Sequence, residues 1–154
     1  MSFADPLLRA ILTGAYQLMK AGWFFHRPRV YGAHAFALTP ERKLILVKLR
    51  YAYGWRPPGG GRHANESPVE AALRELKEEI GMISHGRARL ACELERTVSF
   101  RHDLQSLLIV EDVRYSAPRW SWEVERIMEA PLDELPRDMS PVARLWFEAV
   151  GDLL

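Results

Sequence analysis

Three glutamates recur at helical spacing shortly after a run of glycines, in the segment "PPGGGRHANESPVEAALRELKEEIGM", residues 57–82. Glu75, Glu78 and Glu79 share one face of a helix, because residues three and four positions apart are neighbours on its surface. They rise only about 6 Å along the helix axis. Like charges at this spacing repel, and the last turn of a helix favours cations over anions. The stability of the helix therefore gives no reason for this acidic stripe.

The acidic stripe has two interpretations. A solvated charged face, partly offset by Arg74 and Lys77, is the ordinary one. The other is a site for divalent cations, because hard ions such as Mg²⁺ and Mn²⁺ prefer carboxylate oxygens. A cluster this tight has room for one ion, or for two about 3.5–4 Å apart. Gly59, Gly60 and Gly61 favour the second interpretation, because glycine lets the backbone approach a ligand closely and a backbone carbonyl could join the carboxylates.

The helix that carries the stripe has clear start and end signals. Ser67 is a good N-cap, Pro68 suits the first helical position, and Glu70 completes a capping box with Ser67. Gly81 suits the left-handed residue that follows a helix. The sequence therefore predicts a helix from about residue 68 to residue 80. Its buried face is expected to consist of Val69, Ala72, Leu73, Leu76 and Ile80.

The remaining pattern predicts strands mixed with helices. Strands are expected at 30–38 and 43–50, paired through the turn "TPER", and at 88–100 and 103–115 around a polar turn at Arg101–Asp103. Another strand is expected at 120–130, and a closing helix at 140–154 is capped by Ser140 with Pro141 in its first position. This order predicts an α+β or α/β layered domain, and no linker divides the chain.

The sequence predicts a separate amphipathic helix at about residues 5–25. Its uncharged run from Ala10 to Met19 is too short to span a bilayer, and no clear cleavage site follows it. One side carries Leu8, Ile11, Leu12, Ala15, Leu18 and Met19. We expect this side to pack on the rest of the domain, with a homodimer contact or a membrane-surface contact as the alternatives.

Composition sets the broad class of protein. The chain has 154 residues, of which 48% are hydrophobic, which suits one domain with a core. The net charge of +1 gives no general attraction to nucleic acid or to anionic membranes, so no extended nucleic-acid footprint is expected. Cys92 is the only cysteine, which excludes an internal disulfide and a cysteine-based zinc site. A reducing, cytoplasmic compartment is the matching expectation.

The segment closely resembles the signature of the Nudix hydrolase family. All its fixed positions are filled across residues 60–82, by Gly60, Glu66, Arg74, Glu75, Leu76, Glu78, Glu79, Gly81 and Met82. The flanks "GWRPPGG" and "WEVERIMEAPLDELP" are similar to the family as well, so the resemblance spans about residues 30–150. It implies an α/β/α sandwich around a mixed β-sheet, with the N-terminal helix outside the core fold of a single Nudix domain, residues 1–154. It also implies hydrolysis of a diphosphate linked to another moiety, usually a nucleoside.

The resemblance assigns metal-binding roles. It implies that Glu75, Glu78 and Glu79 bind Mg²⁺ or Mn²⁺, with the carbonyl of Gly59 as a further ligand. Arg74 would orient these carboxylates by a charge-assisted pair. The partner of Arg74 would be Glu78 or Glu66.

The general base has two possible sources in this family. One is a signature glutamate, such as Glu78 or Glu79. The other is a carboxylate from a later strand, for which Glu123 is the best candidate. Glu125 is the rival of Glu123, because the two share a face if the strand at 120–130 forms.

The substrate is less closely defined. Arg50, Arg56 and Arg62 are candidates to hold an outer phosphate. Tyr51, Tyr53 and Trp55 alternate along "YAYGW", so one or two of them could stack on a base, and Trp55 is expected in the core. Nucleoside di- and triphosphates and a 5′-triphosphate RNA end all remain possible substrates.

One residue departs from the family pattern. Asn65 stands where the family commonly has glycine, and because asparagine tolerates left-handed geometry the turn is expected to survive.

The leading function is metal-dependent hydrolysis of a diphosphate bond in a nucleotide-type substrate. The alternatives are a nucleotide-sensing module without hydrolysis, and an acidic helix that binds a partner.

Overall fold

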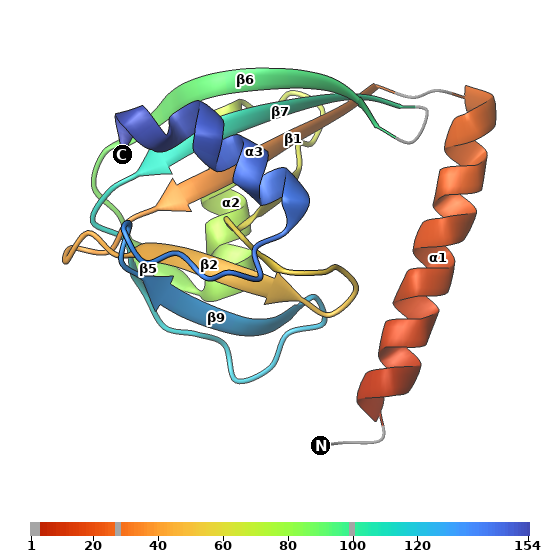
Figure 1. Cartoon of the computed structure of the whole chain (residues 1–154), viewed down its shortest axis with the longest axis horizontal. Helices are drawn as coiled ribbons and strands as arrows, with labels where there is room; N and C mark the ends of the chain where they lie inside the picture. Colours follow the sequence, from red (N-terminus) through yellow and green to blue (C-terminus); the bar gives the residue numbers. More distant parts are fainter. Residues whose placement is uncertain (1–3, 27–28, 99–100) are drawn as a thin grey trace.

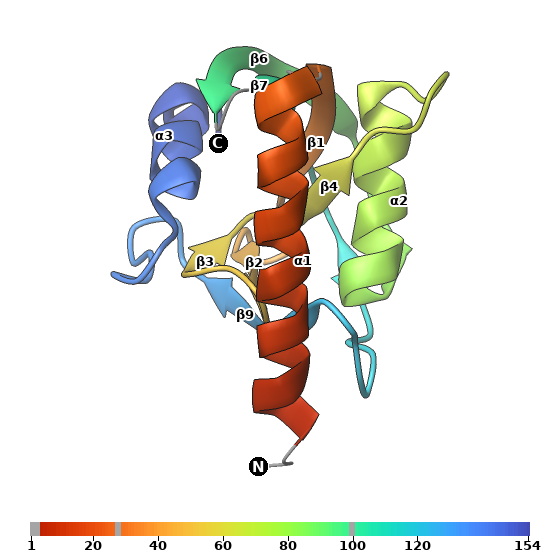
Figure 2. The same ribbon diagram turned by 90° about the vertical axis from the view of Figure 1, so that its right-hand side faces the viewer.

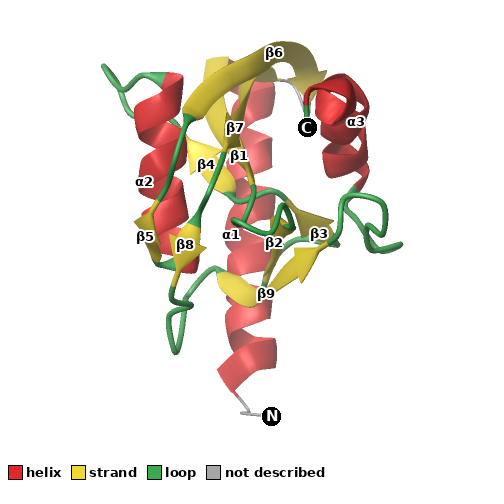
Figure 3. Ribbon diagram, turned by 90° about the vertical axis from the view of Figure 1, so that its left-hand side faces the viewer, coloured by secondary structure: helices red, strands yellow, loops and turns green. Residues whose placement is uncertain are grey.

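The computed structural model describes residues 4–26, 29–98 and 101–154. The helices are α1 (Ala4–His26), α2 (Pro68–Ile80) and α3 (Pro141–Val150), followed by the short 3-10 helix η1 (Gly151–Leu153). The strands are β1 (Arg29–Ala37), β2 (Leu44–Leu49), β3 (Trp55–Arg56), β4 (Gly59–Gly61), β5 (Met82–Ser84), β6 (Ala88–Val98), β7 (Arg101–Val110), β8 (Arg114–Tyr115) and β9 (Val124–Ala130). The strands lie between α2 and α3, which cover opposite sides (Figures 2 and 3). This is the expected α/β/α sandwich.

Parallel and antiparallel pairs coexist in the strand layer. The larger sheet has the order β4-β1-β7-β6, in which only β1 and β7 run parallel. The second sheet has the order β3-β2-β9 and is antiparallel, and β5 pairs with β8 separately. The predicted mixed sheet is therefore confirmed. The hairpin of β6 with β7 is also confirmed by its register, which ends at Val98 opposite Arg101.

Two predictions about the strands were wrong. The strands β1 and β2 were expected to pair, yet they belong to different sheets, and an isolated bridge of Leu38 with Leu44 lies just beyond the end of β1. The reason is that β1 already has β4 on one edge and β7 on the other, which leaves no free edge for β2. The polar turn predicted at Arg101–Asp103 is instead the start of β7. Its polar Asp103 is buried and accepts a hydrogen bond of 2.6 Å from Gln105.

The core divides into two clusters, one on each side of the strands. Ala33 and Ala35 of β1 face α2, where Leu76 and Ile80 are buried beside them. Phe36 of β1 faces the other side, under α3. Because neighbouring residues of a strand point to opposite faces, a strand buried on both faces is apolar at nearly every position. Buried alanines on the α2 side let that helix lie close to the sheet and to the glycines of β4.

The bounds of α2 agree with the prediction at both ends. Ser67 accepts a hydrogen bond from the N–H of Glu70, and the side chain of Glu70 accepts one from the N–H of Ser67, which forms the predicted capping box. Gly81 ends the helix with φ 70°, the expected left-handed geometry. Local capping thus fixes the register in which the glutamates of α2 are displayed.

The helix α1 stands to one side of the strands (Figure 1) and crosses between α2 and α3 in the view of Figure 2. Its apolar side was expected to pack on the domain, and this prediction is wrong. Ile11, Leu18 and Met19 are exposed, while Leu8 and Leu12 are only partly buried. The broad faces of the strand layer are already covered by α2 and α3, so α1 has no open apolar face to cover. Of the helices in the described ranges, none combines the length and apolar character needed to cross a membrane.

Candidate active site

Arg74 links the glycine turn, the loop that follows it and the acidic stripe. Its Nε and Nη2 donate to the two carboxylate oxygens of Glu66 at 2.9 and 3.0 Å. Its Nη1 donates to Glu75 at 2.7 Å and to Glu78 at 3.4 Å, and its Nη2 also reaches the carbonyl of Gly61 at 2.8 Å. The hydrogen bonds from Arg74 lower the pKa of Glu66 to about 2. Both partners considered from the sequence, Glu66 and Glu78, are therefore in contact with Arg74.

Glu79 is the most buried carboxylate of the stripe, with only 5% of its surface exposed. Its Oε2 accepts a hydrogen bond of 2.9 Å from the N–H of Gly59. Burial raises the pKa of Glu79 to about 8, and the nearby Glu75 and Glu123 carboxylates add to the effect. Burial also raises the pKa of Glu75. The protein thus holds carboxyl groups in a place where their negative charge is unfavourable unless a cation compensates it.

Close contacts crowd two of the glycines of β4, Gly59 and Gly60. Gly59 has φ 151°, and a Cβ at this position would lie 2.3 Å from the carbonyl oxygen of Ala33. A Cβ on Gly60 would lie 2.7 Å from Glu75 Oε1. The turn that follows survives the replacement of glycine by asparagine, since Asn65 adopts φ 67° as expected. The backbone of β4 therefore lies directly against the carboxylates of α2.

A cavity of about 580 Å³ opens at this contact, and we call it the main cavity. Its walls comprise the three glycines of β4, the three glutamates of the stripe, Tyr51 and most of the segment 118–123. Glu123 is among the lining residues, so a fourth carboxylate joins the three from α2. Partial burial and the Glu123 carboxylate raise the pKa of Tyr51 to about 12, which keeps its hydroxyl available as a hydrogen-bond donor.

The residues around the main cavity suit a hard dication. All candidate donors are carboxylate or carbonyl oxygens, which Mg²⁺ and Mn²⁺ prefer. Within the described ranges, no three acidic, histidine or cysteine side chains are gathered closely enough to hold an ion as they stand. Glu75 and Glu78 are drawn to Arg74, and one oxygen of Glu79 is occupied by the N–H of Gly59. The unfavourable burial of Glu79 is the observation that fits a cation best.

The segment before β9 differs from the prediction. A strand was expected from residue 120, but β9 begins at Val124, so Glu123 lies in the preceding loop. Ser121 explains the change, because its Oγ accepts hydrogen bonds from the N–H groups of Glu123 and Val124 and forms a turn. Glu125 does not share the surroundings of Glu123. It pairs with Arg9 of α1 at 3.1 Å, away from the main cavity.

The predicted phosphate-binding arginines are not among the residues that line the main cavity. Arg50 donates from Nε to the carbonyl of Ser121 at 3.1 Å. Arg62 donates to the carbonyl of Glu66 at 3.1 and 3.3 Å. Arg56 is partly buried in β3, and this burial lowers the pKa of its guanidinium.

The aromatic residues of "YAYGW" separate into three environments. Tyr51 lines the main cavity, whereas the predicted base-stacking residue Tyr53 is 71% exposed and lines a neighbouring cavity. Trp55 is 6% exposed and belongs to the core, as expected.

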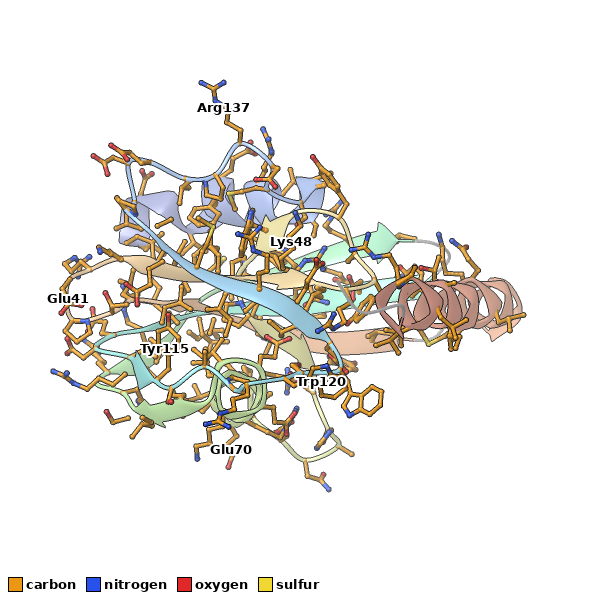
Figure 4. All side chains as sticks on the ribbon, turned by 90° about the horizontal axis from the view of Figure 1, so that it is seen from below. Glu41, Lys48, Glu70, Tyr115, Trp120 and Arg137 are labelled. Carbon is orange, nitrogen blue, oxygen red and sulfur yellow. The ribbon has the colours of Figure 1, made fainter. Side chains whose placement is uncertain are left out.

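Sequence reasoning missed Trp120 and Trp122, which lie at the mouth of the main cavity. They are 54% and 67% exposed and meet edge to face, with ring centroids 4.3 Å apart. Figure 4 shows the Trp120 ring projecting away from the ribbon. Aromatic and polar residues alternate in "WSWE", which is typical of a strand, but Pro118 shortly before them favours a loop. Exposed tryptophans beside a polar site are unusual enough to indicate ligand binding.

Comparison with known proteins identifies the family. The model of the NUDIX domain matches residues 28–150, which is well over half of the chain, so the protein belongs to the Nudix family. Among solved structures it resembles the MutT NUDIX hydrolase from Burkholderia pseudomallei, with 26% identity, a TM-score of 0.66, and coverage of 80% of this chain and 98% of the other. A NUDIX hydrolase from Nitrosomonas europaea shares the fold at 18% identity, with a TM-score of 0.65 over 80% of this chain and 89% of the other.

Curated relatives match over shorter segments. An RNA pyrophosphohydrolase from Hydrogenovibrio crunogenus is 48% identical over 45 residues, which cover 29% of this chain and 27% of that protein. An RNA pyrophosphohydrolase from Xylella fastidiosa (strain M12) is 60% identical over 30 residues, which cover 20% of this chain and 16% of that protein. The matched segments thus span less than a third of the length of these relatives.

Proposed function

We propose that this protein hydrolyses a diphosphate bond in a nucleotide-type substrate and uses Mg²⁺ or Mn²⁺ to do so. The observation that carries the proposal is the burial of Glu79 against the Gly59 turn, in a cavity that three further carboxylates line. A purely structural surface helix gains nothing from a carboxylate that is buried with a single backbone hydrogen bond. A site that must compensate the positive charges of bound cations during turnover does gain from such a carboxylate.

The proposed roles follow from position. Glu75, Glu78 and Glu79, with the carbonyl of Gly59, would hold the dication. The bound ion would supply positive charge against the diphosphate oxygens and acidify water. Arg74 would act as a positioning residue, since it fixes the glutamates through direct hydrogen bonds. These roles suit phosphoryl transfer, in which the protein contributes mainly positioning and electrostatic stabilisation.

The chemical step is an attack by water on phosphorus. The water oxygen forms a bond to phosphorus, the bridging P–O bond breaks, and the leaving phosphate keeps its electron pair. A carboxylate accepts the proton that the water loses. Glu79 is our first candidate for this base, because it is buried where it lines the cavity and the N–H of Gly59 fixes one of its carboxylate oxygens. Glu123 is the second candidate, because it lines the same cavity from the loop before β9.

The mouth of the cavity supports a nucleoside as one part of the substrate. Trp120 and Trp122 offer exposed aromatic surface on which a base can stack, and Tyr51 offers a further ring and a hydroxyl. The curated relatives are named RNA pyrophosphohydrolases, which adds a 5′-triphosphate RNA end to nucleoside di- and triphosphates as candidates. The near-neutral charge of the chain favours a short footprint on any RNA.

The test is a panel of nucleoside diphosphates, nucleoside triphosphates and 5′-triphosphorylated RNA oligomers. Release of phosphate or pyrophosphate is measured with Mg²⁺, with Mn²⁺ and with a chelator. We expect hydrolysis that requires the metal and that is lost in Glu79→Gln. Nucleotide binding without turnover would show a sensing module instead. Unaltered turnover after neutralisation of the α2 glutamates would refute the assignment of the site.

A further inference from the structure

A second cavity, of about 370 Å³, lies between α1 and the segment that follows β2. The helix contributes Arg9 and Thr13, which are four residues apart and hence on one face. The opposite wall contributes Lys48, Arg50 and the exposed Tyr53. Tyr51 lines both this second cavity and the main cavity, so the two cavities are neighbours that share this residue as a wall.

The charge of the second cavity is opposite to that of the main cavity. Three cations, Arg9, Lys48 and Arg50, face one lining carboxylate, Glu125. Arg9 is held by Glu125 at 3.1 Å, and Lys48 lies 3.5 Å from Asp138. Exposed ion pairs of this kind contribute little to stability, so an anionic ligand can compete for the same cations. The second cavity is therefore suited to an anion that also offers surface to a tyrosine ring.

We propose that the second cavity binds a phosphate-bearing group of the substrate that extends beyond the diphosphate held in the main cavity. This inference rests on the proposed function and adds a second subsite to it. The ligand chemistry is a phosphate with an attached group, joined to the scissile diphosphate. It has two possible sources: a further phosphate of a polyphosphate chain, or the next nucleotide linked by a phosphodiester.

The position of α1 supports the proposal. The apolar side of α1 is largely exposed and packs little against the rest of the protein. Its polar residues Arg9 and Thr13, in contrast, line the second cavity. The family match begins at residue 28, so one wall of this cavity comes from a segment outside that match. A ligand that contacts both walls would join α1 to the body of the protein. Binding beyond the diphosphate would then depend on a segment that lies outside the family match.

Two variants separate a ligand site from a structural contact. Arg9→Gln removes a cation and breaks the pair with Glu125. Glu125→Gln breaks the same pair but removes an anion and keeps Arg9. Michaelis kinetics are measured with Mg²⁺ on a nucleoside diphosphate, the tri- and tetraphosphates, and a 5′-triphosphorylated dinucleotide, after thermal unfolding has shown that both variants fold.

We expect Arg9→Gln to raise KM about threefold to fivefold for the extended substrates while kcat stays unchanged. The nucleoside diphosphate should be unaffected, and Glu125→Gln should leave KM equal or lower. An effect on both polyphosphates identifies a phosphate as the occupant, and an effect on the dinucleotide alone identifies the linked nucleotide. Equal losses in both variants, or an equal loss on every substrate, would overturn the proposal.

A binding measurement keeps this inference separate from the proposed function. Equilibrium binding of the same compounds is measured in chelator, where no metal-dependent turnover occurs. If the wild-type protein hydrolyses nothing, the proposed function fails, and the affinities of Arg9→Gln and Glu125→Gln still decide about the second cavity. A loss of affinity in Arg9→Gln together with equal or higher affinity in Glu125→Gln supports a ligand site there, and identical affinities or identical shifts in the two variants exclude it.

Discussion

The backbone N–H of Gly59 donates a hydrogen bond of 2.9 Å to Oε2 of Glu79, twenty residues later in the chain. This contact joins the β4 turn to the last turns of α2 before any ligand is bound. The carboxylate is thereby fixed in one orientation at the wall of the main cavity, which Glu79 lines. Preorganisation of this kind lets a site bind its ligand without first ordering the side chains involved.

Glu79→Gln should abolish catalysis while the protein remains folded. The glutamine side chain can still accept the hydrogen bond from Gly59, but it can neither hold a cation as a carboxylate does nor take up a proton. We expect turnover to fall by about 100-fold or more, which lies in the range for loss of a general base. Steady-state kinetics with Mg²⁺ measure the change. The control is Glu148→Gln on the exposed side of α3, which should keep wild-type kinetics.

The same substitution at Glu123 decides which carboxylate is the base. If Glu123→Gln loses turnover while Glu79→Gln keeps measurable activity and loses metal affinity, the base comes from the loop before β9. Both proteins are compared by kinetics and by calorimetric titration with Mn²⁺.

Gly59→Ala should destabilise the protein strongly, and Gly61→Ala should not. A Cβ at residue 59 would lie 2.3 Å from the carbonyl oxygen of Ala33, at a φ of 151° that side chains rarely adopt, whereas a Cβ at residue 61 meets nothing within 4 Å. We expect Gly59→Ala to lower the free energy of unfolding by about 2–4 kcal/mol. Urea unfolding of both variants measures it. Equal stabilities would contradict the crowding of the β4 turn.

Arg74→Lys should impair both stability and catalysis. A lysine has one ammonium group and cannot reproduce the paired hydrogen bonds to Glu66 together with those to Glu75 and the Gly61 carbonyl. Loss of one partner from such a partly buried cluster leaves carboxylates uncompensated, so the free energy of unfolding should fall by about 1–3 kcal/mol. Urea unfolding with and without Mg²⁺ checks this, and added Mg²⁺ should recover part of the loss. A variant as stable as the wild type under both conditions would contradict this role for Arg74.

His34 should make the protein sensitive to mild acid. The side chain is 9% exposed and lies against Trp146 with ring centroids 4.1 Å apart. Burial, assisted by the charge of Arg56, lowers the pKa of His34 from 6.5 to about 3. Between these two values the unfolded chain binds a proton that the folded protein does not. The contribution of His34 to the free energy of unfolding should therefore fall as pH drops below 6.5, with a slope of up to about 1.4 kcal/mol per pH unit. Glu79, whose pKa is raised by burial, contributes with the opposite sign over the same range.

Urea unfolding of the wild type and of His34→Gln between pH 5 and 6.5 isolates this slope as a difference, because Glu79 is present in both proteins. Relative to the wild type, His34→Gln should gain free energy of unfolding as pH drops through this range, whatever its absolute stability. His102→Gln, at an exposed position, should keep the wild-type slope. Parallel profiles for all three proteins would contradict a buried neutral His34.

Local signals predicted the parts of the site that short segments determine. The capping box of Ser67 with Glu70 and the exit at Gly81 placed α2 to the residue. Asn65 adopts the left-handed geometry that the signature requires at its place. These features depend on hydrogen bonds and torsion angles within a few residues, so the sequence contains the information for them directly.

Features that depend on distant segments were not predictable in the same way. The alternation around Trp120 and Trp122 favours a strand, but Ser121 bends the backbone while Arg50 holds its carbonyl. Whether Tyr51 or Tyr53 faces the carboxylates depends on how the chain leaves β2, and periodicity does not determine this. Nor does the amphipathic pattern of residues 4–26 reveal that the sheet faces are already covered by other helices.

The two tryptophans at the mouth of the main cavity also provide an intrinsic fluorescent probe of ligand binding. Trp120 and Trp122 are surrounded largely by water, whereas Trp55 and Trp146 are enclosed in the core. The emission of Trp120 and Trp122 should therefore be red-shifted relative to that of the buried tryptophans, and a stacked base should quench it. A fluorescence titration of the unlabelled protein can then follow occupancy at the cavity mouth in real time, and replacement of both residues by phenylalanine would remove the ligand-dependent part of the signal.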